Sequence, residues 1–398
     1  FGDAEDAHRA LAEVMQKYYT TPTHENIKTI AEHWRRGARP AHAIRLLYDA
    51  GEASYQSLDL DAAREYFLRI QKILDVATDL RTGSDEHSIP FARPHIWLRL
   101  GEIHGALNEH GAAEDALNRA LADANSEDRE IGGRAHKLLG DLAATQERYN
   151  DALRHYEVGR NAFRELGEAR PFVAITGEMG QCALMQGRPS LAEDLTSQAL
   201  QMAAKLQDDS LVARINRLMG QVLTRRARFM EAADYLLTSM SLFESIGRGY
   251  DVIECLTELG HAYFASGEYA SSREHFTQAV AVSSSLYIST THEPHLGIAR
   301  ALAAGENLDQ AEAHLAAALA RTGTARELNR LAEVHLYSGD LHLARRDHTG
   351  AVEHYERTIE LSKQIGLTRQ WINALIRLAY VELDRGNEPA VYARFGEA

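Results

Sequence analysis

The sequence predicts an all-α protein, a solenoid of antiparallel helix pairs repeated about eight to nine times. Three observations support this prediction. Small residues recur every 39 or 40 residues along most of the chain, each is followed by residues at helical spacing, and only eight prolines occur among 398 residues. A fixed period of this length is typical of repeat proteins, in which each unit buries its apolar face against its neighbours.

The small residue that marks each period lies inside what otherwise reads as one apolar helix. In the stretch from Glu254 to Val280 this mark is Gly260, although a glycine inside a helix costs ~1 kcal/mol relative to alanine. We expect the mark to be small because a second helix lies close against it. The marks are Gly101, Gly140, Gly180, Gly220, Gly260, Ala299, Gly339 and Ala379.

A second helix follows each mark. A small residue comes twelve positions after most marks, a larger one sixteen positions after, and often another small one nineteen positions after. In the unit of Gly260 these residues are Ser272, Phe276 and Ala279. Spacings of four and three place them on one helical face, so Phe276 and Ala279 are expected to pack near Gly260.

The break between the two helices carries turn and capping residues. Gly187 and Gly267 occupy this break in two units. Asn150 and Asp309 stand where a side-chain oxygen could cap the second helix. Two helices per unit follow from this pattern.

The repeated unit resembles the tetratricopeptide repeat, whose signature is a large residue, Leu-Gly, Tyr, Ala, Phe and Ala. The match covers residues 94 to about 388 and implies a right-handed superhelical solenoid. The last unit departs from the signature at Glu388 and Pro389, so a short C-terminal cap is expected there. The signature is approximated by Trp97, Leu100, Gly101, Ala113, Leu117 and Ala120, and again by Leu259, Gly260, Tyr263, Ser272, Phe276 and Ala279.

The N-terminal part departs from the 40-residue period. Residues 4–19 and 24–36 read as two helices, and Gly51 marks a divergent helix pair whose next mark comes 50 residues later. The extra residues are rich in turn formers and bounded by prolines, which indicates a loop. The predicted segments are a helical junction at 1–39, a first helix pair at 40–80, a loop or hinge at 81–93 and the solenoid at 94–398.

The stretch from His8 to Leu74 resembles a second known arrangement. Its segments HRALAEVM, IAEHWRRGARPAHAIRLLYDAGE and LDAAREYF are similar to the region joining the nucleotide-binding core to the repeats in bacterial STAND signalling ATPases. Those ATPases include proteins linked to class III cyclases or LuxR-type regulators. The resemblance implies that this chain is the sensor arm of such a protein. Its start at Phe1, without methionine, suggests a piece of a longer protein.

Composition narrows the function classes. With 43 basic and 57 acidic residues the net charge is −14, which argues against direct nucleic-acid binding and against an anionic membrane surface. Cys182 and Cys255 form no CxxC pair, and no run of 18 apolar residues occurs. We therefore expect a cytoplasmic chain without disulfides.

No catalytic signature is found in the sequence. GxxxxGK[ST], HExxH and GxSxG motifs are all absent. The densest histidine run, His335, His342, His348 and His354, has spacings of seven, six and six, which do not place two metal ligands one helical turn apart. We expect no enzyme activity, no cofactor and no metal, and we interpret these histidines as packing or surface residues.

Binding to a partner is the function that remains. In tetratricopeptide proteins the resemblance implies contact positions six and three before the mark and one and four after it, on the concave face of the first helices. At these positions two units carry basic residues and the unit between them carries alanine and glycine, so an anion could bind between two basic walls. The candidate groove residues are Arg134, Lys137, Asp141, Ala174, Gly177, Gln181, Arg214, Arg217, Gln221, Arg225 and His261.

Two alternatives to this pocket stay open. In one, the cations pair with carboxylates of neighbouring repeats, as Arg214 could with Glu254, and the series is a solvated surface. In the other, the binding face lies toward His261, Phe264, Arg300 and Tyr380, or on the convex side of the solenoid.

Two function classes are also open. The first is a regulatory sensor arm that binds a peptide, a protein or a small anionic effector and relays this event to an attached signalling ATPase and output domain. The second is a free-standing scaffold or peptide receptor. Only the first requires a nucleotide-binding core encoded before Phe1.

Overall fold

The computed structural model describes residues 2–76, 93–124, 128–286, 292–321, 328–365 and 368–387, together with 389, 391, 392 and 396. Every regular element in these residues is an α-helix. The chain divides into two compact units, Phe1–Arg188 and Pro189–Ala398, which are called here the N-terminal and C-terminal units. The predicted loop at 81–93 lies outside the described residues except for Arg93, and so does most of the expected C-terminal cap.

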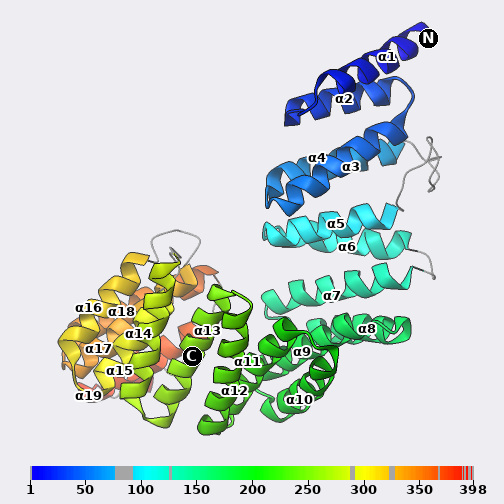
Figure 1. Cartoon of the computed structure of the whole chain (residues 1–398). Coiled ribbons are helices and arrows are strands. Elements are labelled where there is room, and N and C mark those ends of the chain that lie inside the picture. Colours follow the sequence, from blue (N-terminus) through cyan, green and yellow to red (C-terminus); the bar gives the residue numbers. More distant parts are fainter. Residues whose placement is uncertain are drawn as a thin grey trace. The chain divides into compact units, whose positions relative to one another are not determined.

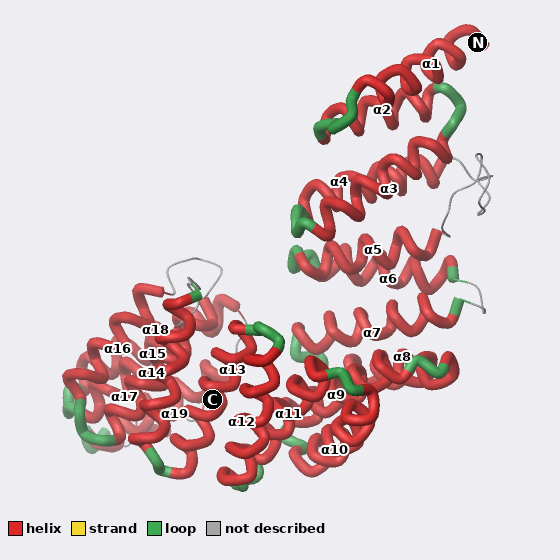
Figure 2. Tube along the Cα trace, in the orientation of Figure 1, coloured by secondary structure: helices red, strands yellow, loops and turns green. Residues whose placement is uncertain are grey.

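The helices of each unit are drawn and labelled in chain order in Figures 1 and 2. The N-terminal unit holds α1 (Gly2–Tyr18), α2 (His24–Arg36), α3 (Pro40–Gln56), α4 (Leu60–Val76), α5 (Arg93–Ala106), α6 (His110–Asp123), α7 (Arg129–Thr145), α8 (Tyr149–Leu166) and α9 (Ala169–Met185). The C-terminal unit holds α10 (Pro189–Leu206), α11 (Asp209–Arg225), α12 (Phe229–Ser245), α13 (Gly249–Ser266), α14 (Tyr269–Ser285), α15 (His292–Ala304), α16 (Leu308–Arg321), α17 (Leu328–Ala344), α18 (His348–Ile365) and α19 (Thr368–Asp384).

Within each unit the helices pack as pairs. In the N-terminal unit α3 packs on α4, α5 on α6 and α7 on α8, and each second helix also contacts the first helix of the next pair. In the C-terminal unit the same holds from α11 and α12 to α17 and α18. Successive first helices, such as α13 and α15, also contact one another. The predicted solenoid of helix pairs is therefore confirmed.

Each pair is held close by a large side chain lying on the mark of the period. A Cβ added to Gly260 of α13 would lie 2.7 Å from the ring of Phe276 on α14, and Gly297 of α15 touches the same ring from the next repeat. Phe276 is fully buried between these two glycines. The equivalent contacts join Gly101 to Leu117, Gly140 to Tyr156, Gly220 to Leu236 and Gly339 to Tyr355. Gly180 is also buried.

Where the large residue is tyrosine, an aspartate follows the mark. The hydroxyl of Tyr156 donates a hydrogen bond of 2.8 Å to Asp141, and Tyr355 donates one of 2.8 Å to Asp340. Both rings are buried, and burial together with the nearby carboxylate raises the pKa of each phenol. A buried hydroxyl needs a hydrogen-bond partner, and the residue after the mark is placed to supply it.

The turn between the two helices of a repeat is fixed by the backbone. The residue seven positions after each mark has φ between 58° and 85°, whether or not it is glycine. The next amide donates back to the carbonyl three positions after the mark, as from Glu268 to Tyr263 at 2.9 Å. These residues are Leu58, Asn108, Glu147, Gly187, Ala227, Gly267, Glu306, Arg346 and Gly386.

The expected side-chain caps at Asn150 and Asp309 are wrong. Asn150 lies inside α8 and Asp309 inside α16, and the N-cap residue of α8, Arg148, makes no capping hydrogen bond through its side chain. Side-chain acceptors do occur at the start of three second helices, but they come before the helix: Asp59 accepts from the amide of Ala62 at 3.1 Å, Asn307 from that of Gln310 at 3.4 Å and Asp347 from that of Gly350 at 3.0 Å. Thr23 of α2 and Asp208 of α11 cap their helices in the same way.

Two glycines of α7 test the packing at the mark. A Cβ on Gly140 would lie 2.5 Å from the Tyr156 ring, whereas one on Gly132 would meet no atom within 4 Å. Gly140→Ala should therefore cost about 1–3 kcal/mol by overpacking. Gly132→Ala should be neutral or stabilise by up to about 1 kcal/mol, because it lowers the entropy of the unfolded chain. Urea unfolding followed by circular dichroism measures both, and equal midpoints for the two variants would contradict the packing described here.

Candidate functional site

The positions expected to contact a partner make polar contacts between successive first helices. We call this series the polar ladder. In two repeats the residue one position after the mark bonds to the residue six positions before the next mark. These pairs are Glu102 with Arg134 at 3.0 Å and His261 with Glu293 at 3.2 Å. In other repeats the residue one position after the mark bonds to the residue two positions before the next mark. These pairs are Glu52 with Arg99 at 2.7 Å, Gln221 with Glu258 at 2.6 Å and Asp340 with Arg377 at 2.6 Å.

Arg134, Lys137 and Arg217, three of the cations proposed for the anion pocket, have carboxylate partners. Besides the pair of Arg134, Lys137 bonds to Asp141 of its own helix at 2.6 Å, and Arg217 lies 2.9 Å from Glu254 on α13. Burial raises the pKa of Glu254, and the Arg217 guanidinium opposes this shift. The expected carboxylate is therefore in place, but it pairs with Arg217.

The remaining candidates lie in two separate units, and the anion pocket stays a prediction. In the N-terminal unit Ala174 and Gln181 are half-buried and Gly177 is buried. In the C-terminal unit Arg214 and Arg225 are exposed on α11.

The C-terminal unit has a cavity on its first helices. Its volume is about 270 Å³, and side chains from α13, α15, α16, α17 and α19 line it. Arg300 is one position after its mark and Phe264 four positions after, so both are at expected contact positions. The lining residues used below are Phe264, Arg300, Leu315, Tyr337, Asp340 and Arg377.

Arg300 lies between two aromatic rings at this cavity. Its guanidinium carbon is 4.5 Å from the centre of the Phe264 ring and 4.6 Å from that of Tyr337. Among the described residues no carboxylate pairs with it, whereas Arg377 nearby is held by Asp340. Stacking uses the faces of a guanidinium and leaves the N–H groups at its edge able to donate. Burial raises the pKa of Tyr337, so its hydroxyl stays protonated at neutral pH.

Three repeats contain a pair of facing histidines that the sequence analysis missed. One histidine is four positions before the mark and the other fifteen after it, on the two helices of the repeat. Their Nδ1 atoms lie 3.1 Å apart in His136 and His155, 3.1 Å in His295 and His314, and 2.9 Å in His335 and His354. At these distances one ring must donate and the other accept. The constant spacing of nineteen residues is the signal that could have revealed them.

The predicted histidine run partly converges in space. His354 lies between His335 and His342, with 5.0 Å between the ring centres of His342 and His354. Spacing along one helix could not show this, because the rings come from α17 and α18. No group of three or more His, Cys, Asp or Glu side chains in the described residues is arranged to hold a metal ion.

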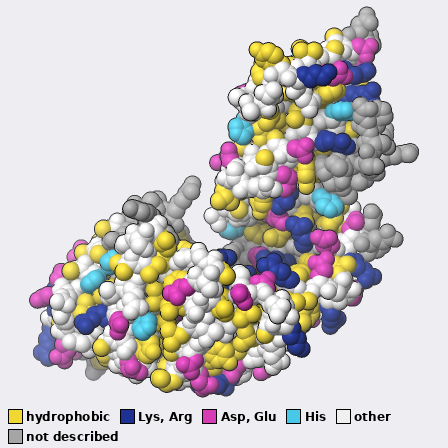
Figure 3. Space-filling model, in the orientation of Figure 1, with side chains coloured by type: hydrophobic (Ala, Val, Ile, Leu, Met, Phe, Trp, Pro, Cys, Tyr) yellow, Lys and Arg dark blue, Asp and Glu magenta, His cyan; other side chains and the backbone are white. Residues whose placement is uncertain are grey.

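Charged side chains of both signs are mixed on the surface. Acidic and basic side chains are interspersed over both units on the face drawn in Figure 3. Within the described residues, no helix combines the length and hydrophobicity needed to cross a bilayer.

Together the period, the helix pairs and the packing at the marks define a class of repeat protein. The tetratricopeptide repeat family matches residues 94–122, 211–285, 257–325 and 296–364. The chain folds as a tetratricopeptide-like solenoid of about nine repeats. This fold is used for binding proteins and peptides.

Several solved structures share the fold. The apo form of the quorum sensor NprR from B. thuringiensis is 13% identical, with a TM-score of 0.60 over 89% of this chain and 97% of that one. A Rap protein complexed with Competence and Sporulation Factor is 13% identical, with a TM-score of 0.55 over 87% and 99%. A STAND protein with a tetratricopeptide repeat sensor from Pyrococcus horikoshii is 12% identical, with a TM-score of 0.53 over 94% and 51%.

At these identities the likeness shows the fold alone. The structure from Pyrococcus horikoshii is a STAND protein, the class whose junction region residues 8–74 resemble in sequence. No curated protein sequence matches the chain significantly.

The histidine pairs predict acid sensitivity. Burial, with the neighbouring His354 and Arg357, lowers the pKa of His335 to about 4, against about 6.5 when unfolded. Between these values the unfolded chain binds more protons than the folded one, so stability should fall as pH drops from about 6.5 toward 4. Thermal melts across this range should show a smaller pH slope for His335→Leu than for the parent.

His275 offers a matched control for this prediction. It occupies the position of His354, fifteen residues after the mark, but it stacks on Tyr263, with ring centres 5.0 Å apart, and the position equivalent to His335 in this repeat is Leu256. His275→Leu should keep the slope of the parent. Equal slopes for His335→Leu and the parent would show that the pair does not contribute.

Proposed function

We propose that this chain is the non-catalytic sensor arm of a bacterial cytoplasmic signalling protein. It binds a peptide or a segment of a partner protein on its first helices and relays this event to an attached ATPase and output domain. The observation that carries the proposal is Arg300, stacked between Phe264 and Tyr337 at the edge of a cavity on the first helices.

The cavity favours a peptide over a small effector. Pockets for drug-sized ligands have volumes of roughly 300–1,000 Å³, and this one, at about 270 Å³, is smaller. A single side chain of a bound peptide could enter it and contact Leu315 and Leu341. The donors of Arg300 could then bind a carboxylate of the same peptide.

The relay rests on the resemblance of residues 8–74 to the junction of STAND ATPases. A STAND protein with a tetratricopeptide repeat sensor shares the fold, as do the quorum sensor NprR and a Rap protein complexed with Competence and Sporulation Factor. A free-standing scaffold or peptide receptor is the alternative. The coding sequence before Phe1 separates the two, because only a sensor arm requires a GxxxxGK[ST] motif upstream.

Arg300 is the residue that tests binding. Peptides selected from a random displayed library on the purified chain should include acidic members, and Arg300→Met should weaken them by about 10–100-fold, the worth of a hydrogen bond between charged groups. Methionine keeps much of the packing between the rings while removing the donors. Isothermal titration calorimetry measures the affinities.

Arg225→Met is the matched control, because Arg225 is exposed on α11 and is one of the other candidate groove residues. It should leave the affinity unchanged. If Arg225→Met and Arg217→Met weaken the peptides while Arg300→Met does not, the basic stretch at α11 is the binding site.

A further inference from the structure

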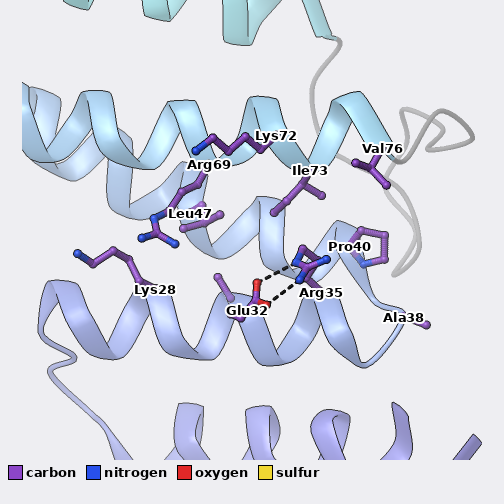
Figure 4. A pocket seen from close by; sticks show the side chains of 11 residues that line it. Lys28, Glu32, Arg35, Ala38, Pro40, Leu47, Arg69, Lys72, Ile73 and Val76 are labelled. Atoms are coloured by element: carbon purple, nitrogen blue, oxygen red, sulfur yellow. Dashed lines mark hydrogen bonds and ion pairs between the residues drawn. The ribbon is translucent and has the colours of Figure 1, made fainter. Parts of the chain in front are cut away.

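The N-terminal unit has a larger cavity on its second-helix side. It lies between α2 and α4 over α3, and its volume is about 560 Å³ (Figure 4). None of the groove positions expected from the repeat pattern lies here. The cavity is separate from the one at Arg300, which belongs to the C-terminal unit.

The two ends of this cavity differ in chemistry. The amino and guanidinium groups of Lys28, Arg69 and Lys72 gather at one end in Figure 4. Ile73, Pro40 and Val76 lie toward the other end, where the ion pair of Arg35 with Glu32 also lies. Ala31, Leu47 and Ile73 are buried and form an apolar floor. A ligand that fits both ends has a charged head and an apolar body.

The sign of the charge at the cavity is positive. Four cations and one carboxylate line it, in a chain whose net charge is −14. The carboxylate, Glu32, accepts hydrogen bonds from Arg35 at 2.8 and 2.6 Å, and these bonds lower its pKa to about 2. Glu32 is therefore ionised and paired at neutral pH, so it does not need a cationic ligand.

The other cations are neutralised unequally. Lys28 is held by Glu25 and Glu65, and Arg69 also bonds to Glu65 at 3.1 Å. Lys72 is exposed and makes no ion pair with any described residue. The excess positive charge at the basic end therefore centres on Lys72, with Arg69 one turn before it on α4.

We propose that this cavity binds a small amphipathic organic anion, with its carboxylate on Lys72 and Arg69 and its apolar body over Leu47 and Ile73. The volume lies within the range of roughly 300–1,000 Å³ that is typical of small-molecule sites, which are mostly apolar with a few placed polar groups. The same chemistry disfavours a nucleotide or nucleic acid, which would leave the apolar floor unused.

Decanoate is the probe, because it combines one carboxylate with a flexible apolar tail. Calorimetry with the full chain should give one site, about tenfold or more weaker for Lys72→Glu, since the variant removes an ion pair and adds repulsion. Decanol and decyltrimethylammonium should bind at least about tenfold more weakly than decanoate, because they lack the charge that the cations bind. A photoreactive decanoate analogue should label peptides of residues 24–76.

Lys17→Glu is the matched control, since Lys17 is exposed on α1 of the same unit and outside the cavity. It should leave decanoate binding within about twofold, as expected for an isolated surface charge. Arg300→Met should also leave it unchanged, which separates this site from the proposed peptide site.

Three results would overturn the proposal: equal affinity of Lys72→Glu and the parent, decanol binding as tightly as decanoate, or labelling outside residues 24–76. Lys72→Gln, which removes the charge without reversal, covers the case in which Lys72→Glu alters the fold. A chain that binds an acidic helical peptide at this cavity but no decanoate would assign the surface to a protein partner instead.

Discussion

The structure depends on the close approach of two helices over a small residue. Phe276 shows the constraint most fully, because its ring fits between Gly260 in its own repeat and Gly297 in the next. One side chain thus joins the helices of one pair and also joins that pair to the following one. The free energy that a glycine costs inside a helix is offset by the apolar area buried at this contact. Every other regularity, including the polar ladder and the histidine pairs, follows from the register that this contact sets.

The polar ladder limits where a partner can bind. In the solenoid, positions one after the mark and two or six before it face the neighbouring first helix, so side chains there reach each other as readily as they reach a ligand. Except for the exposed contact of His261 with Glu293, the contacts of the ladder named above are partly buried, so a ligand would have to compete with them. Arg300 differs because aromatic rings, and not a carboxylate, hold it in place. A site where a cation is positioned without being neutralised can bind a partner without first breaking an ion pair.

The helices and their pairing could be predicted because they depend on residues near in sequence and on a period that repeats. The contact of Gly260 with Phe276 is of this kind. The pairs of residues in the polar ladder could not be predicted, because spacing within one helix does not show which residue of the next helix lies opposite. For that reason Arg214 was considered as a partner of Glu254, and not Arg217, which lies 2.9 Å from Glu254 in the structure. The cavity at Lys72 was missed for another reason: its first helix pairs diverge from the period, so no repeat position pointed to it.

The pairing of Tyr156 with Asp141, and of Tyr355 with Asp340, has a consequence for how such an array can change over time. Replacing only the tyrosine by leucine leaves the aspartate without its phenol, and replacing only the aspartate leaves a buried hydroxyl unbonded. The two positions therefore constrain each other's substitutions, although fourteen residues separate them. Repeats of this kind exchange most easily as whole cassettes, by duplication or recombination at the turns, because a cassette carries both members of the pair together.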